Sequence, residues 1–275
     1  MKKILITKLV VLSILLIVVC GIASTAFIGY KTNWGFFSNR DSAKNELVKE
    51  ERFSNIENIK VNVVEESIVV YEHNSNDVVV KYYGNKDRVP VMNATGNDLR
   101  IEREKEWYFF VFNFGYSGRV EIYAPSDQIN KLDLSNVSGS VDVQPDIKDL
   151  FVDTVSGNIE GQASGIDADL NTVSGNIRMY GTFNEIDAET VSGNIRLKTE
   201  ANSKLTASTV SGTVRCNLYD PSVGYEVEFS SVSGSFKDEY NNQKFSGDMK
   251  TNFGDRELQF DVETVSGGFK LEDWD

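Results

Sequence analysis

The sequence predicts an all-β fold, a parallel β-solenoid with coils of about 18 residues, preceded by one N-terminal transmembrane helix. The main observation is a repeat: the tripeptide Val-Ser-Gly occurs seven times, beginning at positions 137, 155, 173, 191, 210, 232 and 265. The step between copies is constant at first and lengthens toward the C-terminus. A period of this size is typical of solenoids, in which each repeat forms one coil and stacks on the next. The second observation is an uncharged segment at residues 9–30.

The uncharged segment at residues 9–30 predicts a membrane anchor. A helix needs about 20 apolar residues to cross a bilayer. Lysines lie within residues 1–8, and positive charge stays in the cytoplasm, so we expect the rest of the chain outside the cell membrane. Two alternatives are a signal peptide cleaved at the small residues 24–26 and a lipoprotein signal ending at Cys20. The apolar run continues past both sites, which favours an uncleaved single-pass anchor.

The region between the anchor and the repeats predicts a tether and a cap. Residues 31–52 are largely polar after their aromatic start and read as a tether that keeps the domain close to the membrane. Residues 53–126 contain short strand patterns, expected to form irregular N-terminal coils that cover the end of the core. The aromatic stretch at residues 107–116 is expected in that cap core, with a membrane-touching hairpin as the alternative. Residues 127–275 form the regular coils.

Aligning the repeats on the valine reveals apolar columns. Apolar residues occupy the positions five and three before the valine, the valine itself and the position four after it. This alternation predicts two short half-buried strands per coil, joined by a Ser-Gly corner. Successive coils are expected to stack about 4.8 Å apart, so that the apolar columns form the core. Length variation falls in one loop, and its longest form, residues 239–259, is expected to hold a small hairpin. The last residues, 269–275, are expected to cap the C-terminal end.

The polar residues of the repeat predict a scaffold rather than a catalytic motif. A Ser-Gly corner that recurs seven times without a base beside each copy is best explained by geometry. We expect the glycine to supply positive φ angles and the serine to bond nearby backbone groups. The threonines and asparagines of the repeated "TVSGNI" are expected to form ladders of hydrogen bonds that fix the register.

One charged column suggests a binding surface. Five positions after the valine, the charge changes from acidic to basic along Asp142, Glu160, Arg178, Arg196, Arg215, Lys237 and Lys270. Like charges about 4.8 Å apart repel, so such a row needs solvent or neutralising partners. A solvated outer face is one interpretation. The other makes Arg178, Arg196 and Arg215 the ligand-binding residues, for an anionic glycan, a teichoic acid or a phospholipid headgroup.

Composition excludes several classes of function. The net charge of −13 argues against nucleic acid as a partner. His73 is the only histidine, and Cys20 and Cys216 are far apart, so we expect no histidine-dependent triad, no metal site and no cofactor. The Gly-Gly-x-Gly-x-Asp signature of calcium-binding rolls does not occur.

The segments "FSNIENIKVNVVEESIVVYE", "VEIYAPSDQINKLDLSNVSGSVDV" and the repeated "TVSGNI" resemble the bacterial family of putative adhesins known as domain of unknown function 4097. The resemblance covers residues 50–275 and implies a right-handed β-helix-like fold without agreed catalytic residues. An N-terminal anchor followed by one such domain is similar to the membrane-anchored LiaG-type proteins of Gram-positive bacteria, which are associated with cell-envelope stress operons.

These features predict a non-enzymatic binding or sensing module of the cell envelope. Its partner is expected to be a membrane protein, a lipid headgroup or a wall polymer. One alternative is an enzyme acting on polysaccharide, with Asp169 and Asp187 as neighbouring carboxylates one coil apart. Another is a structural module that assembles through the solenoid ends.

Overall fold

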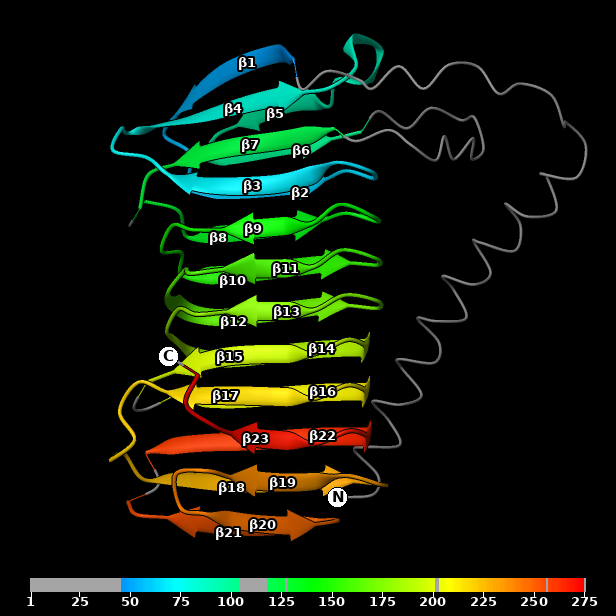
Figure 1. Ribbon diagram of the computed structural model, residues 1–275. Helices are drawn as coiled ribbons and strands as arrows, with labels where there is room; N and C mark the ends of the chain where they lie inside the picture. The colour runs from blue at the N-terminus through cyan, green and yellow to red at the C-terminus, as the bar shows by residue number, and fades with distance from the viewer. Residues whose placement is uncertain (1–45, 104–117, 127, 201–202, 256, 275) are drawn as a thin grey trace, which may run out of the picture. The chain divides into compact units, whose positions relative to one another are not determined.

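The computed structural model describes residues 46–103, 118–126, 128–200, 203–255 and 257–274 (Figure 1). In this part of the chain the regular structure is β-strand, apart from a short 3-10 helix, η2 (Lys86–Arg88). The predicted anchor and the whole aromatic stretch at residues 107–116 lie outside the described residues. Among those described, no helix is long and apolar enough to cross a membrane.

The strands form two sheets, which we call sheet A and sheet B. Sheet A contains β1 (Leu47–Ser54), β3 (Ser67–Glu72), β4 (Asp77–Tyr83), β7 (Arg119–Ala124), β9 (Val141–Val143), β11 (Ile159–Gly161), β13 (Ile177–Met179), β15 (Ile195–Thr199), β17 (Val214–Leu218), β19 (Ser235–Asp238), β20 (Gln243–Ser246) and β23 (Phe269–Leu271). Sheet B contains β2 (Asn58–Asn62), β5 (Val91–Thr95), β6 (Asp98–Glu102), β8 (Lys131–Ser135), β10 (Asp149–Thr154), β12 (Gly165–Thr172), β14 (Phe183–Ser192), β16 (Lys204–Ser211), β18 (Tyr225–Ser231), β21 (Met249–Phe253) and β22 (Leu258–Ser266).

Each regular coil contributes one strand to each sheet, as the repeat predicts. Within the range from β8–β9 to β16–β17, each coil pairs in parallel with the next coil in the sequence. Leu150 lies in register with Leu132 on one side and with Ala168 on the other. Stacked coils are visible as rungs in Figure 1. This part of the fold class, an all-β solenoid of parallel coils, is therefore confirmed.

The core lies between the two sheets and consists of the predicted columns. The positions five and three before the valine, and the position four after it, are buried in every repeat. At the C-terminal end the core becomes aromatic, because Phe236 stacks on Phe269 with ring centroids 5.0 Å apart. Burying such side chains contributes about 1.5–3 kcal/mol each to the free energy of folding.

The valine of the repeat was expected in the core, and this expectation is wrong. Val137 and Val232 are 38% and 73% exposed, and the valines of the other repeats are partly exposed. The residue before the valine is the one that points inward, and it is buried at Thr154, Thr172, Thr190, Thr209 and Thr264. The hydroxyl of Thr172 donates to the carbonyl of Gly157 in the preceding coil (3.1 Å). A threonine can thus fill the core position because its hydroxyl satisfies a corner carbonyl.

The corner glycines are required by the close approach of successive coils. They do not have the positive φ angles that we expected. A Cβ atom on Gly193 would lie 1.8 Å from the carbonyl oxygen of Gly175, one coil away. The asparagine ladder completes the corner: the backbone N–H of Asn176 donates to Oδ1 of Asn158, and that of Asn194 to Oδ1 of Asn176 (2.9 and 3.0 Å). This ladder was predicted and is confirmed.

At the C-terminal end, the order of coils in space differs from their order in the chain. Coil β22–β23 lies between β16–β17 and β18–β19, and it pairs in parallel with both (Figure 1). The columns still align, since Phe260 is in register with Leu205 on one side and Val227 on the other. Residues 269–275 therefore do not cap the solenoid, contrary to expectation.

The insertion at residues 239–259 closes this end instead. β20 pairs antiparallel with β19 in sheet A, and β21 pairs antiparallel with β18 in sheet B. The insertion thus supplies the loop and one strand of a hairpin formed with β19, whereas β20 and β21 extend different sheets and do not pair with each other. Beneath them, the fully buried Asp238 accepts hydrogen bonds from the Tyr225 hydroxyl (2.6 Å) and from the Asn241 side chain (3.0 Å). Burial and the contact with Asp238 raise the pKa of Tyr225.

The N-terminal end also combines parallel coils with antiparallel strands. Coil β2–β3 pairs with β8–β9 on one side and with β6–β7 on the other. β4 then pairs antiparallel with β7, β5 with β6, and β1 with β4. Both ends of the stack thus finish in antiparallel strands. The predicted tether at residues 31–52 is therefore wrong at its C-terminal end, because β1 begins at Leu47 and belongs to sheet A.

Candidate functional site: a charged and aromatic face of sheet A

The charged column lies on the outer face of sheet A. Arg178 and Arg196 are in register, as are Arg196 and Arg215, so the structure places the three candidate arginines side by side. The chain reversal then sets Lys270 next to Arg215, followed by Lys237 and Lys244. On the other side of Arg178 lie Glu160 and Asp142. We call this row the charge column.

Ion pairs neutralise parts of the charge column. The Arg178 guanidinium contacts the Glu160 carboxylate at 2.5 Å, and that of Arg215 contacts Glu272 at 3.1 Å. Arg196 lies between these two arginines, is partly exposed, and forms no ion pair with any of the described residues. The centre of the column therefore carries an uncompensated positive charge.

The acidic end of the column holds two carboxylates on neighbouring strands, one of them partly buried. Asp142 and Glu160 are in register on β9 and β11. Partial burial, with a smaller contribution from Glu160, raises the pKa of Asp142 above its ordinary value. At the basic end, Lys237 donates a hydrogen bond to Glu239 (2.6 Å), which raises the pKa of Lys237.

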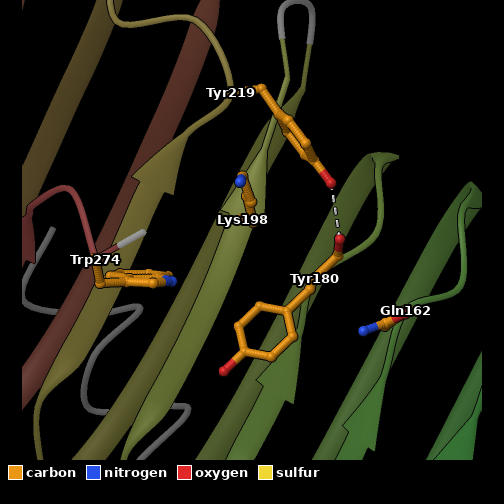
Figure 2. Close-up of a pocket in the computed structure, with 5 residues that line it drawn as sticks. All are labelled: Gln162, Tyr180, Lys198, Tyr219 and Trp274. Atoms are coloured by element: carbon orange, nitrogen blue, oxygen red, sulfur yellow. Dashed lines mark hydrogen bonds between the residues drawn. The ribbon is translucent and has the colours of Figure 1, made fainter.

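A pocket of about 520 Å³ opens beside the charge column (Figure 2). Its lining consists of Gln162, Tyr180, Lys198, Tyr219 and Trp274. The first three each come two residues after a member of the charge column. Gln162 and Tyr180 lie directly beyond the ends of β11 and β13, and Lys198 lies within β15. The sequence argument missed this pocket, because Tyr219 and Trp274 follow the ends of strands and belong to no repeated column.

Two contacts fix the polar side of the pocket. The hydroxyl of Tyr219 donates to the carbonyl oxygen of Tyr180 (2.9 Å), which ties the end of β17 to that of β13 (Figure 2). The Lys198 ammonium lies 4.5 Å from the centroid of the Tyr219 ring, a cation–π contact that holds the lysine at the pocket wall.

The C-terminal tail brings Trp274 to the pocket. The backbone N–H of Glu272 donates to the carbonyl of Cys216 (3.1 Å), and the Asn217 amide donates to the Asp273 carboxylate (3.3 Å). Both contacts form because β23 pairs with β17 as well as with β19. The interleaved coil order therefore completes the pocket.

Other reactive side chains do not assemble into a further site among the described residues. Asp169 and Asp187 are in register on β12 and β14, as predicted, and Asp169 accepts a hydrogen bond from Asn171 (2.7 Å). Within the described ranges, no group of three His, Cys, Asp or Glu side chains could hold a metal ion. Cys216 is buried, and burial raises the pKa of its thiol.

Stacked parallel coils with one charged and aromatic outer face define a β-solenoid with a surface suited to binding. The chain belongs to the Toastrack family, DUF4097, whose sequence profile matches residues 56–183 and 162–272. This confirms the family resemblance. No curated protein matches the sequence.

Several solved structures resemble the chain at low identity. A putative adhesin from Bacteroides fragilis is 14% identical, with 84% of this chain and 99% of that chain covered and a TM-score of 0.48. A putative lipid binding protein from Parabacteroides distasonis is also 14% identical, with coverages of 84% and 98% and a TM-score of 0.42. A putative cell adhesion protein from Clostridium sporogenes is 12% identical, with coverages of 82% and 99% and a TM-score of 0.32.

Proposed function

We propose that this protein is a non-enzymatic binding module of the cell envelope, and that the outer face of sheet A binds an anionic envelope polymer. The observation that carries the proposal is Arg196. It lies between Arg178 and Arg215 and has no ion-pair partner among the described residues. Repulsion from both neighbours is relieved when an anion approaches, so the column favours a negatively charged ligand.

The spacing of the charge column suits an extended ligand. Its six successive cations stand on neighbouring strands, which lie about 4.8 Å apart in a sheet. Each exposed contact with an anion contributes little by itself. A polymer with regularly spaced negative charges can contact several of them at once, and linked contacts strengthen binding beyond any single one. A wall polymer therefore fits the column better than a lone small anion does.

We further propose that residues 9–30 anchor the chain in the cell membrane, as in LiaG-type proteins, with the residues between this anchor and β1 as a tether and the solenoid outside. The uncharged segment and its preceding lysines support this orientation. A role in the response to envelope stress would follow from such a position. Protease added to intact cells is expected to degrade the solenoid, and its protection would contradict the orientation.

Binding is tested with the full chain in phosphatidylcholine nanodiscs. The probes are poly(glycerol phosphate) and, separately, vesicles containing phosphatidylglycerol. We expect the polymer to bind and the triple change of Arg178, Arg196 and Arg215 to Gln to weaken binding by about tenfold or more. Added salt should weaken binding as well, because it screens exposed charges.

Two further variants sharpen this test. Arg100→Gln removes an exposed arginine from β6 in sheet B and should leave binding unchanged. Glu160→Gln removes the partner of Arg178 and should strengthen binding. Equal binding by the wild type and the triple variant would contradict the assigned surface. Binding to the vesicles but not to the polymer would mean that the ligand of this face is a lipid. Cleavage of the polymer during the assay would contradict a non-enzymatic role.

A further inference from the structure

We infer that the pocket lined by Gln162, Tyr180, Lys198, Tyr219 and Trp274 is a saccharide subsite, which binds one sugar unit of an anionic polymer lying along the charge column. The inference rests on the proposed function and adds the identity of the group that the face selects. With this subsite, the face recognises a glycosylated polymer and not negative charge alone.

The lining of the pocket fits the two surfaces of a sugar ring. The C–H groups on a pyranose face form an apolar, slightly positive surface that packs on an aromatic ring, whose face is negative. Trp274 and Tyr180 supply such rings at the pocket wall (Figure 2). The hydroxyl groups at the sugar edge need hydrogen-bond partners, which the Gln162 amide and the Lys198 ammonium provide.

The size and rigidity of the pocket fit the same ligand. A volume of about 520 Å³ lies within the range of roughly 300–1,000 Å³ that is typical of small-molecule sites. The bond between Tyr219 and Tyr180, and the anchoring of the tail by Glu272 and Asp273, hold the lining in place before a ligand arrives. A pre-formed site loses little conformational entropy on binding.

The pocket and the charge column belong to one continuous surface. Lys198 follows Arg196 by two residues on β15, so both side chains point outward, with Cα atoms roughly 7 Å apart. A sugar in the pocket therefore places a phosphate or carboxylate of the same polymer within reach of Arg196. No described carboxylate pairs with that arginine, so the anion meets no competitor there.

The test compares two polymers on the full chain in phosphatidylcholine nanodiscs: plain poly(glycerol phosphate) and the same polymer bearing hexosyl groups. We expect the wild type to bind the hexosylated polymer about tenfold more tightly. Trp274→Ala and Tyr180→Ala should each remove this preference while leaving the affinity for the plain polymer unchanged. Arg196→Gln should weaken binding of both polymers. Phe151→Ala, which removes a ring from the outer face of sheet B, should alter neither.

Failure of the subsite differs from failure of the proposed function. If both polymers bind equally well, or if the pocket variants keep the preference, the saccharide subsite is wrong and the charged face stands. If neither polymer binds the wild type, the proposed function is wrong. The subsite is then judged by an uncharged probe, a trisaccharide of N-acetylglucosamine. Quenching of tryptophan emission that Trp274→Phe abolishes would support the subsite, and absence of quenching would overturn it.

Discussion

The middle of the solenoid and its C-terminal end use the same coil but follow the chain differently. From β8 to β17, neighbours in space are neighbours in sequence, whereas β22–β23 separates β16–β17 from β18–β19. The residue columns align in both regions. This difference shows that side chains at the corner and in the core set the register, while the connecting loops set the order of the coils.

The largest expected effect separates these two kinds of coil by deletion. Removing residues 258–275 and removing residues 172–189 shorten the chain by the same length. The middle deletion rejoins identical repeats and leaves every remaining coil with two neighbours, so we expect a folded protein. The C-terminal deletion strips the partner from both β17 and β19 and loses a ladder of buried apolar side chains, each contributing about 1.5–3 kcal/mol.

Thermal unfolding followed by circular dichroism measures both deletions. The C-terminal variant should show no cooperative unfolding transition on heating from room temperature, whereas the middle variant should show one. Equal midpoints would mean that β18–β19 restacks on β16–β17, and that the observed order carries no energetic weight.

Glycine substitutions should distinguish the middle from the end on a smaller scale. Gly193→Ala forces a Cβ to within 1.8 Å of the Gly175 carbonyl and should cost about 2–3 kcal/mol of unfolding free energy. At Gly247, in the turn between β20 and β21, an added Cβ would meet no other atom. Gly247→Ala should therefore cost only the backbone strain of a φ of 77°, about 1–2 kcal/mol of unfolding free energy. Chemical denaturation measures both, with exposed Ser192→Ala as a control expected to stay within about 0.5 kcal/mol. A milder effect at Gly193 than at Gly247 would contradict close coil approach.

Buried polar groups provide the next comparison. Tyr225→Phe leaves the buried Asp238 carboxylate without its hydroxyl donor and should destabilise the end by about 1–2 kcal/mol. Thr190→Val in the middle removes a longer bond to the Gly175 carbonyl (3.3 Å) and should cost about 1 kcal/mol or less. Urea unfolding of both variants tests the ranking, which a larger loss at Thr190 would reverse.

The smallest effect concerns charge and has the opposite sign. The raised pKa of Asp142 means that the folded state holds this proton more tightly than the unfolded chain, so ionisation costs stability at neutral pH. Asp142→Asn should therefore stabilise the protein at pH 7, by less than about 1 kcal/mol because the group is partly exposed. The gain should vanish as the pH falls below the ordinary carboxyl value of about 3.9. A gain that persists there would point to packing instead.

The sequence predicts the register of the coils well but not the order of the last two. Leu205 fits against either Val227 or Phe260, so the columns are satisfied by both arrangements. The valine was misplaced because the period-2 alternation continues unbroken up to it, so that Ile186, Ala188 and Thr190 point inward and Val191 points outward. A hydroxyl bonded to a carbonyl makes a threonine such as Thr172 acceptable inside.

The sequence predicted one part of the candidate site, the row of arginines, but not the pocket beside it. The alignment of Arg178, Arg196 and Arg215 follows from the nearly constant spacing of the repeats that carry them. The pocket was missed, because only the interleaved coil brings Trp274 to the same pocket as Tyr180. Tyrosines that follow strand ends two coils apart, at positions 180 and 219, were the available signal.

The interleaved coil also determines when the protein can finish folding. Synthesis delivers the chain from its N-terminus, yet the strands that join β17 to β19 lie within the segment 258–275. Until that segment emerges, the solenoid keeps open strand edges, and open edges pair readily with other chains. Completion of this end, together with the pocket that depends on it, therefore waits until the segment 258–275 has been synthesised.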